Sequence, residues 1–320
     1  MIKANGRAAK APVTFLKIFI TFGALWFVFY KYGAARILSV IAGADGKWLL
    51  VAALIVAVHL FVVAFRWRLV HTLLVGRSLP YGLLFGSLGR GLLLGQLLPA
   101  IVGSDAIRIA AIIRSVGMVN AARSVASDRI LGVWGLMALE AATLPMVAVV
   151  IPDWQMTAAL AVICFGGMAV FFVMPLWPRI LPNLPFLQRF VVQAASDARL
   201  VLVSAPGIYA LALSVVAHIV SVFLFAALAR SLGAMISVGM CIVFIPSVLL
   251  ISGLPISLGG WGLREVAVTL AFSTIGVEPA TASASSILFG LTTPAMGLLA
   301  ELIALAFHTI SAKTSDTGVN

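Results

Sequence analysis

Charged residues are scarce in this chain of 320 residues, since only 10% are Asp, Glu, Lys or Arg. Soluble domains usually contain about 25% charged and about 45–50% apolar residues. Here hydrophobic residues reach 62%, and they come in repeated runs of membrane-spanning length. A water-soluble globular domain is therefore excluded, and the hydrocarbon core of a bilayer is expected to surround most of the chain.

Cysteine is scarce, and recognisable catalytic motifs are lacking. The chain has 2 cysteines, Cys164 and Cys241, which lie inside apolar runs without CxxC or metal-ligand spacing, and we interpret them as small core residues. No GxSxG, HExxH or P-loop motif is found. We therefore expect no cofactor, no enzymatic activity and no ATP-driven transport by this chain alone. The connectors between apolar runs are too short for a soluble catalytic domain.

Basic residues outnumber acidic residues by 21 to 10, which gives a formal net charge of +11. Nucleic-acid binding would require these residues to cluster on a folded soluble face. They lie instead between the apolar runs, where cytoplasmic loops of membrane proteins accumulate Lys and Arg. The charge thus indicates membrane topology, and no nucleic-acid partner is expected.

Uninterrupted apolar runs predict six full crossings, and two further stretches are broken in the middle. The broken stretches, 81–113 and 236–276, contain the sequences LLPAIVGSD and SGLPISLGGWG. Pro and clustered Gly free backbone groups that hydrocarbon cannot satisfy, so each stretch is predicted to be a re-entrant helical hairpin. The six crossings are expected at about residues 13–30, 48–70, 129–151, 157–175, 207–229 and 284–308.

The distribution of basic residues predicts the orientation. With a cytoplasmic N-terminus, most of the 21 basic residues fall on the inner side of a bacterial-type inner membrane, and both termini are cytoplasmic. We interpret the first run as a retained crossing and not as a signal peptide. The inner connector includes an amphipathic stretch, 186–203, that is expected to lie on the membrane surface. The outer side keeps Lys31, Arg36, Lys47, Arg230 and Arg264.

The two broken stretches share the pattern LPxxxGxxxxR. Leu98, Pro99, Gly103 and Arg108 align with Leu254, Pro255, Gly259 and Arg264. Weak internal symmetry is common in transporters, although chance similarity of apolar segments is the alternative. Duplication predicts two halves, 1–155 and 156–320, with three crossings each, so that the second half is inverted. The predicted fold is an all-α integral membrane protein with six full crossings and two re-entrant helical hairpins in an inverted repeat.

Polar residues follow each break, where a helix restarts. Ser104 and Asp105 can cap the first helix, and Gly259, Gly260 and Gly262 permit close backbone approach at the second. A helix N-terminus inside the membrane, with Arg108 or Arg264 in its first turns, favours an anion such as phosphate. Asp105 would partly occupy the first site. The alternative for the two arginines is structural pairing with Asp105 and Glu265.

Two acidic residues lie within crossings. Glu140 follows Arg129 by about 16 Å of helix at 1.5 Å per residue, near the bilayer centre. Glu301 is shallower in the last crossing. Each either pairs with an arginine of the hairpins or accepts a proton during transport, and the sequence leaves both roles open.

Further charged residues lie at the inner ends of crossings, where a solvated or headgroup-facing role is the default. These are Arg66, Arg68, Asp128 and Arg129, and the spacing of the first two suits a lipid headgroup. His59 and His218, in the crossing before each break, are interpreted as packing residues.

Four motifs, FRWRLV (65–70), GQLLPAIVGSDAIR (95–108), SDRILGV (127–133) and PISLGGWGLRE (255–265), carry a family resemblance. Over nearly the whole chain, the sequence resembles the flippase-like transmembrane region of lysylphosphatidylglycerol synthases. The resemblance implies translocation of a phospholipid or another lipid. Because the soluble aminoacyl-transfer domain is lacking, we do not expect the chain to make that lipid. The matching residues are Arg66, Arg68, Pro99, Gly103, Asp105, Arg108, Asp128, Arg129, Pro255, Gly259, Gly260, Arg264 and Glu265.

The leading hypothesis is a lipid translocase that moves a phospholipid, a modified phospholipid or a lipid-linked molecule between leaflets. Its expected partners are membrane lipids with anionic or modified headgroups and an enzyme of lipid synthesis. One alternative is an integral membrane transferase or phosphatase that acts on a polyprenyl phosphate through Glu140, Asp105 or Asp128. Another is an accessory subunit of a lipid-modifying pathway.

Overall fold

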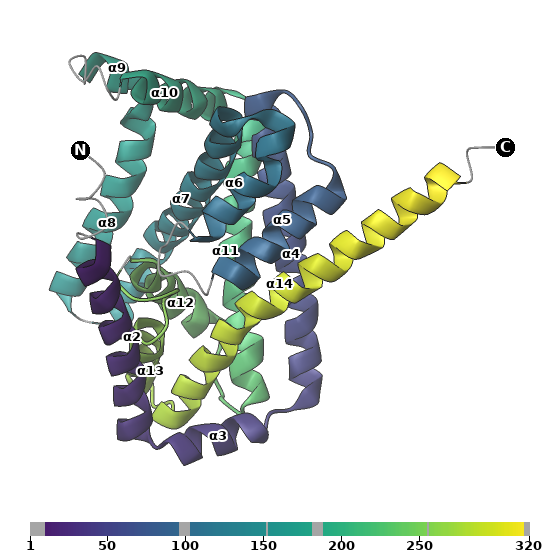
Figure 1. The fold of residues 1–320 in the computed structure, drawn as a ribbon. Helices are drawn as coiled ribbons and strands as arrows, with labels where there is room; N and C mark the ends of the chain where they lie inside the picture. The colour runs from purple at the N-terminus through teal and green to yellow at the C-terminus, as the bar shows by residue number, and fades with distance from the viewer. Residues whose placement is uncertain (1–9, 96–102, 152, 181–187, 255, 317–320) are drawn as a thin grey trace.

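The computed structural model describes residues 10–95, 103–151, 153–180, 188–254 and 256–316, and every regular element within these ranges is a helix. With the labels of Figure 1, the helices that begin before residue 154 are α2 (Lys10–Tyr32), α3 (Ala34–Ala42), α4 (Gly46–Val75), α5 (Tyr81–Gly95), α6 (Gly103–Val116) and α7 (Met118–Val150). The later elements are α8 (Trp154–Val173), η1 (Met174–Leu176), α9 (Trp177–Ile180), α10 (Gln188–Val203), α11 (Ala205–Ser231), α12 (Val238–Gly253), α13 (Leu263–Ser273) and α14 (Pro279–Asp316).

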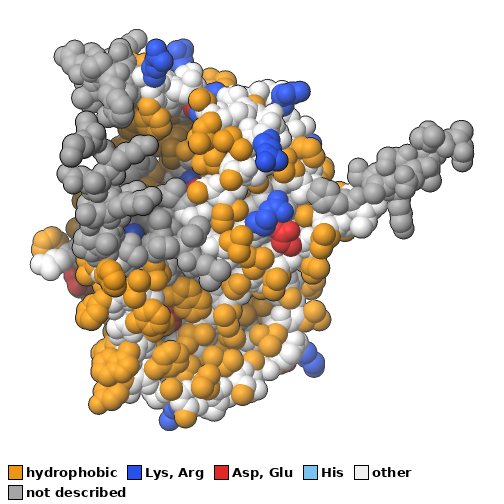
Figure 2. All heavy atoms as spheres, in the orientation of Figure 1, with side chains coloured by type: hydrophobic (Ala, Val, Ile, Leu, Met, Phe, Trp, Pro, Cys, Tyr) orange, Lys and Arg blue, Asp and Glu red, His pale blue; other side chains and the backbone are white. Residues whose placement is uncertain are grey.

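Helices long and apolar enough to cross a membrane number 6 in the described part of the chain, and they confirm the six predicted crossings. They are α2, α4, α7, α8 continued by η1, α11 and α14. Large apolar side chains such as Phe19 and Val149 point outward, and hydrophobic side chains are spread over the described face that Figure 2 shows. Such a surface is stable only against lipid, so the chain is a multi-pass membrane protein.

Polar side chains fix the starts of several crossings. The carboxylates of Asp45 and Asp153 accept backbone N–H groups at the starts of α4 and α8. The hydroxyl groups of Ser204 and Ser237 do the same at the starts of α11 and α12. Each cap satisfies a donor that lacks a partner within its own helix, so these positions set where the helices begin.

Each broken stretch contains two short helices that pack against each other, α5 with α6 and α12 with α13. The close approach of α5 and α6 depends on small residues, because a Cβ atom at Gly95 would lie 2.7 Å from the Cβ atom of Ser104. In the second stretch, the segment 256–262 joins the helices through glycines with positive φ. Pro99 and Pro255, the prolines of the two predicted breaks, lie outside the described residues.

Helices from the first half of the chain pack against helices from the second half. α4 lies along α11, while α5 packs on α14 and α12 packs on α7. At the α5–α14 contact, a Cβ atom at Gly89 would lie 2.9 Å from the carbonyl oxygen of Gly297, so the absence of side chains allows the backbones to meet. The predicted units 1–155 and 156–320 therefore share one packed interior.

Two shorter helices cross the ends of the bundle. In Figure 1, α10 lies across one end and α3 across the other. α10 confirms the helix predicted within 186–203, since Val191, Ala195 and Ala198 are buried on one face, whereas Arg189 and Arg199 are exposed. The outward side also carries exposed Phe190 and Val192, and Asp197 is buried on the inward side. The position of α10 across the end of the bundle fits a helix at the membrane surface.

Candidate functional site

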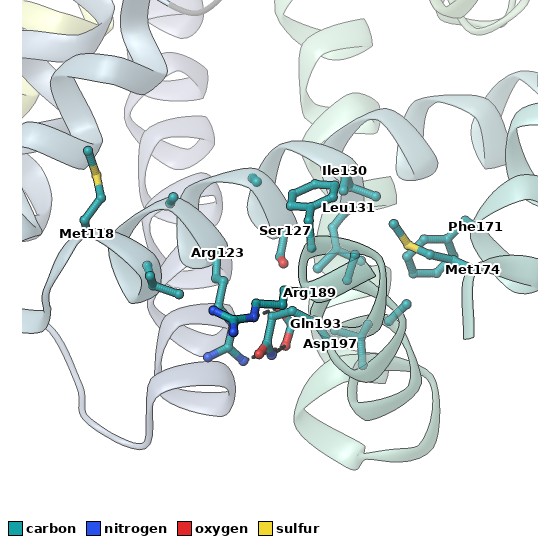
Figure 3. A pocket seen from close by; sticks show the side chains of 17 residues that line it. Met118, Arg123, Ser127, Ile130, Leu131, Phe171, Met174, Arg189, Gln193 and Asp197 are labelled. Atoms are coloured by element: carbon teal, nitrogen blue, oxygen red, sulfur yellow. Dashed lines mark hydrogen bonds and ion pairs between the residues drawn. The ribbon is translucent and has the colours of Figure 1, made fainter. Parts of the chain in front are cut away.

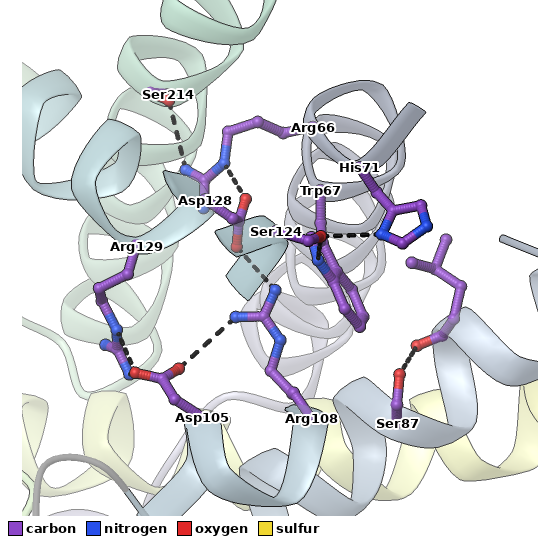
Figure 4. A network of polar contacts seen from close by, with 11 residues as sticks. Arg66, Trp67, His71, Ser87, Asp105, Arg108, Ser124, Asp128, Arg129 and Ser214 are labelled. Carbon is purple, nitrogen blue, oxygen red and sulfur yellow. Dashed lines mark hydrogen bonds and ion pairs between the residues drawn. The ribbon is translucent and has the colours of Figure 1, made fainter. Parts of the chain in front are cut away.

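Five charged side chains from three helices meet in one network (Figure 4). Asp128 on α7 accepts hydrogen bonds from Arg66 Nε on α4 at 2.9 Å and from Arg108 Nη2 on α6 at 2.8 Å. Asp105 Oδ2 on α6 accepts from Arg129 Nε on α7 at 3.0 Å, and its other oxygen lies 3.7 Å from Arg108 Nη1. We call these five residues the arginine–aspartate network.

The network runs from the interior to the surface. Arg66, Arg108 and Asp128 are each 6% exposed or less, whereas the Arg129 side chain is 47% exposed. The predicted solvated surroundings are therefore wrong for Arg66 and Asp128, which are buried. The physical reason is that α4, α6 and α7 converge there, so that the guanidinium groups of Arg66 and Arg108 neutralise the Asp128 carboxylate in place of water.

Neutral side chains hold the buried end of the network in position. The Trp67 ring stacks under the Arg108 guanidinium at 4.1 Å, and Trp67 Nε1 donates to Ser124 Oγ at 3.0 Å. Ser214 Oγ on α11 accepts a long hydrogen bond from Arg66 at 3.4 Å. Sequence reasoning missed these three residues. A signal existed for Trp67 alone, because it stands between the two arginines of the FRWRLV motif.

The charges of the network do not balance. Arg66, Arg108 and Arg129 supply three positive charges against the two negative charges of Asp105 and Asp128, so one positive charge remains. In addition, the buried Arg108 Nε has no hydrogen-bond partner in the described part of the chain. Guanidinium groups form paired, charge-assisted hydrogen bonds with phosphate and carboxylate oxygens. The arrangement is therefore suited to bind an anionic group.

The second break holds a buried ion pair of its own. Glu265 is fully buried and accepts hydrogen bonds from Arg264 Nη2 at 2.7 Å, from Ser286 Oγ at 3.0 Å and from the backbone N–H of Gly262 at 2.6 Å. The structural pairing considered for Arg264 is thus confirmed. The Glu265 carboxylate takes one of the N–H donors at the start of α13, the donors that the sequence had suggested for a ligand anion.

Glycines shape the surroundings of this ion pair. Gly260 has a φ angle of 81°, in a region that side chains disfavour, and a Cβ atom there would lie 3.1 Å from the Ser252 carbonyl oxygen. Gly290 on α14 leaves room for the Arg264 guanidinium, since a Cβ atom at that position would overlap it. The close backbone approach predicted at Gly260 is therefore present. Gly259, the neighbouring predicted residue, also has a positive φ angle of 57°.

The two arginines aligned by the LPxxxGxxxxR pattern have matching environments. Arg108 and Arg264 are 6% and 7% exposed, and each pairs with an almost fully buried carboxylate. Each guanidinium also faces an indole ring, Trp67 at 4.1 Å for Arg108 and Trp261 at 4.8 Å for Arg264. The arrangement of guanidinium, acid and indole thus occurs once at each broken stretch, although Trp67 comes from α4 and Trp261 from the second break itself.

The remaining acidic candidates lie apart from the network. Glu140 is fully buried, accepts a hydrogen bond from Ser247 Oγ at 2.8 Å and pairs with no arginine in the described ranges. Its second oxygen has no partner among the same residues. Glu301 lies 3.9 Å from Nη1 of Arg90, an arginine of the first broken stretch. Of the two roles left open for these acids, pairing with an arginine is found for Glu301. In the described residues Glu140 has Ser247 on α12 as its partner instead of an arginine.

The other predicted residues serve local packing. Arg68 donates to the Leu79 carbonyl at 3.3 Å and to Tyr81 Oη at 3.0 Å, away from the network. Ser104 lies against the glycines of α5, where a Cβ atom at Gly91 would be 3.2 Å from its hydroxyl oxygen. His218 Nε2 contacts the Gly132 carbonyl at 2.9 Å, a packing role of the kind predicted for it.

The fold and the site define a multi-pass α-helical membrane protein with a buried arginine–aspartate network between its helices. The chain belongs to the family described as the lysylphosphatidylglycerol synthase TM region, whose model matches residues 14–300. The match confirms the resemblance found in the motifs and connects the protein with lipid modification or translocation. Neither the search of the curated proteins nor that of the solved structures found a match.

Proposed function

We propose that this protein moves a phospholipid with an anionic headgroup between the leaflets of the bilayer and binds that headgroup at the arginine–aspartate network. The observation that carries the proposal is the unbalanced positive charge, which extends from buried Arg108 to half-exposed Arg129. A polar cluster inside a membrane protein is costly and is normally retained for a binding site or a pathway. The excess charge of this cluster is positive, so the ligand that it favours is an anion.

The five side chains have two different roles in the proposed binding. The buried part is rigid and consists of Arg66, Asp128 and Arg108. In it the Asp128 carboxylate holds both guanidinium groups in place, so that they are neutralised without water. Asp105 is the exchangeable part, because it is more exposed and holds Arg129 in a pair that reaches the surface. An incoming phosphate replaces Asp105 as the partner of Arg129, and the acyl chains stay in the bilayer. Both network carboxylates are engaged by arginines, which favours binding over acid–base catalysis.

The proposal includes two re-entrant hairpins, α5–α6 and α12–α13, in an inverted repeat. Reciprocal packing supports it: α5 contacts α14 just as α12 contacts α7, and α4 lies along α11. When the two LPxxxGxxxxR motifs are aligned, α5 corresponds to α12, α7 to α14 and α4 to α11, so each contact has its counterpart in the other half. The matching environments of Arg108 and Arg264 add further support. Inverted repeats allow one half to rock against the other, so that a central site opens to each side in turn.

The proposed orientation places both termini in the cytoplasm of a cell with an inner membrane, and cysteine accessibility tests it. In a variant without Cys164 and Cys241, single cysteines at the exposed positions Trp154, Phe190 and Met235 should react from the outside, the inside and the outside, respectively. The measurement is labelling of intact cells with a membrane-impermeant maleimide, before and after permeabilisation. Outside labelling at Phe190 would contradict the six-crossing topology.

Translocation in vesicles tests the function itself. Arg129→Gln removes the excess charge while leaving the buried pairs of Asp128 intact, so translocation of fluorescent phosphatidylglycerol should slow about ten-fold, the effect of one charge-assisted contact. The rate is measured by dithionite quenching in proteoliposomes. Arg114→Gln, an exposed site on α6, is the matched control and should retain the wild-type rate. Equal rates for both variants, or no rate above protein-free vesicles for the wild type, would remove the proposed function.

A further inference from the structure

A groove lies between α7, α10 and the end of α8, apart from the arginine–aspartate network (Figure 3). It encloses about 520 Å³ and is lined mainly by apolar side chains, among them Ile130, Phe171, Met174 and Ala194. This volume falls within the range of about 300–1,000 Å³ found for ligand pockets. The groove and the network use different faces of α7, because Ser127 and Ile130 face the groove and Asp128 faces α4 and α6.

One edge of the groove is polar and carries excess positive charge. Arg123 on α7 donates to both carboxylate oxygens of Asp197 on α10, at 3.0 and 2.5 Å, and Gln193 donates to the same carboxylate at 3.0 Å. Asp197 is therefore neutralised within the groove. Arg189 also lines this edge, is exposed and has no ion-pair partner among the residues that the structure describes. Two arginines against one carboxylate leave one positive charge beside an apolar cavity.

The place of the groove in the fold fits an amphiphilic ligand. α10 lies across the end of the bundle, with Val191, Ala195 and Ala198 buried and Arg189 exposed. At such a depth acyl chains and headgroups meet, so a lipid can present apolar and charged parts to one site. Anionic lipids are also attracted to basic residues at a membrane surface.

We propose that this groove is a second lipid site, which binds an anionic phospholipid with its phosphate at Arg189 and an acyl chain against Phe171, Met174 and Ile130. The site goes beyond the proposed translocation, since it shares no residue with the network. Its occupant ties α10 to α7 and helps to hold the surface helix in place. Lipid binding in the groove therefore does not depend on translocation at the arginine–aspartate network.

Photolabelling of the full-length protein tests the assignment. The probe is phosphatidylglycerol with a diazirine on its acyl chain, present at trace level in phosphatidylcholine vesicles, and the comparison is a phosphatidylcholine probe of the same design. Peptides from 118–131 and 189–201 should be labelled by the anionic probe about five-fold more than by the neutral one, as expected for one basic contact at the surface. Labelled peptides are identified by mass spectrometry.

Two pairs of variants separate the groove from the general lipid-facing surface. Ala194→Trp fills the groove and should abolish this labelling, whereas Val192→Trp, on an exposed face of α10, should not. Arg189→Gln should remove the preference for the anionic probe, whereas exposed Arg199→Gln should retain it. Arg189 is exposed, so its replacement tests the site without disturbing the packed interior. Equal labelling by both probes, labelling unaffected by Ala194→Trp, or crosslinks to a second copy of the chain in place of lipid would overturn the proposal.

Discussion

Replacing Asp128 by asparagine is expected to destabilise the protein by about 3–5 kcal/mol, the usual cost of removing one partner of a buried ion pair. Asp128 is only 1% exposed and accepts hydrogen bonds from both Arg66 and Arg108. Without the carboxylate, two guanidinium groups remain in the interior with no negative charge between them. The measurement is the free energy of unfolding in detergent micelles, together with abundance in the membrane.

Asp45→Asn is the control for this loss of charge. Asp45 is an exposed N-cap of α4, and asparagine caps helices as well as aspartate does, so stability should stay within about 0.5 kcal/mol of the wild type. If the two variants unfold at the same denaturant concentration, Asp128 does not hold the arginines, and the rigid part of the proposed site does not exist.

Glu265→Gln is expected to have an effect of similar size in the second broken stretch, again about 3–5 kcal/mol. In the wild type the Glu265 carboxylate accepts hydrogen bonds from Arg264 Nη2, Ser286 Oγ and the Gly262 N–H. Glutamine has only one acceptor oxygen, and its NH₂ group would face donors in place of the second oxygen. The substitution thus removes a countercharge and leaves one acceptor oxygen where two now serve the Gly262 N–H on one side and Arg264 with Ser286 on the other. Unfolding in detergent micelles measures the loss.

A surface glutamate provides the comparison for this second prediction. Glu278 pairs with Arg36, but their side chains are 40% and 69% exposed, so Glu278→Gln should change stability by about 1 kcal/mol or less. A loss for Glu265→Gln no larger than that for Glu278→Gln would show that the buried pair is dispensable. The proposed equivalence of the Arg108 and Arg264 ion pairs would then be wrong for Arg264.

Much of the fold could be predicted from run lengths and helix-breaking residues. The six crossings follow from apolar runs, and the paired short helices follow from Pro and Gly in the two broken stretches. The shared packing of the two halves could not be predicted, because it depends on contacts such as Gly89 against Gly297. Glycines at a helix contact look like any other glycine in a single sequence.

The candidate site was only partly predictable. Its five charged members were all named from the motifs, but Arg66 and Asp128 lie at the ends of apolar runs, where solvent is the default surrounding. Their burial depends on the convergence of α4, α6 and α7, which local sequence does not encode. The groove under α10 is a similar case, since Arg123 and Asp197 come from distant segments and join only in the folded chain.

Charge reversal at Arg129 tests the central claim most directly. Arg129→Glu changes the balance of the network from one excess positive charge to one excess negative charge, while Arg114→Glu makes the same change at an exposed site on α6. The quantity to measure is the ratio of translocation rates for phosphatidylglycerol and phosphatidylcholine in the same proteoliposomes. The account predicts a ratio well above one for the wild type and for Arg114→Glu, and below one for Arg129→Glu. The same ratio in all three proteins would contradict it.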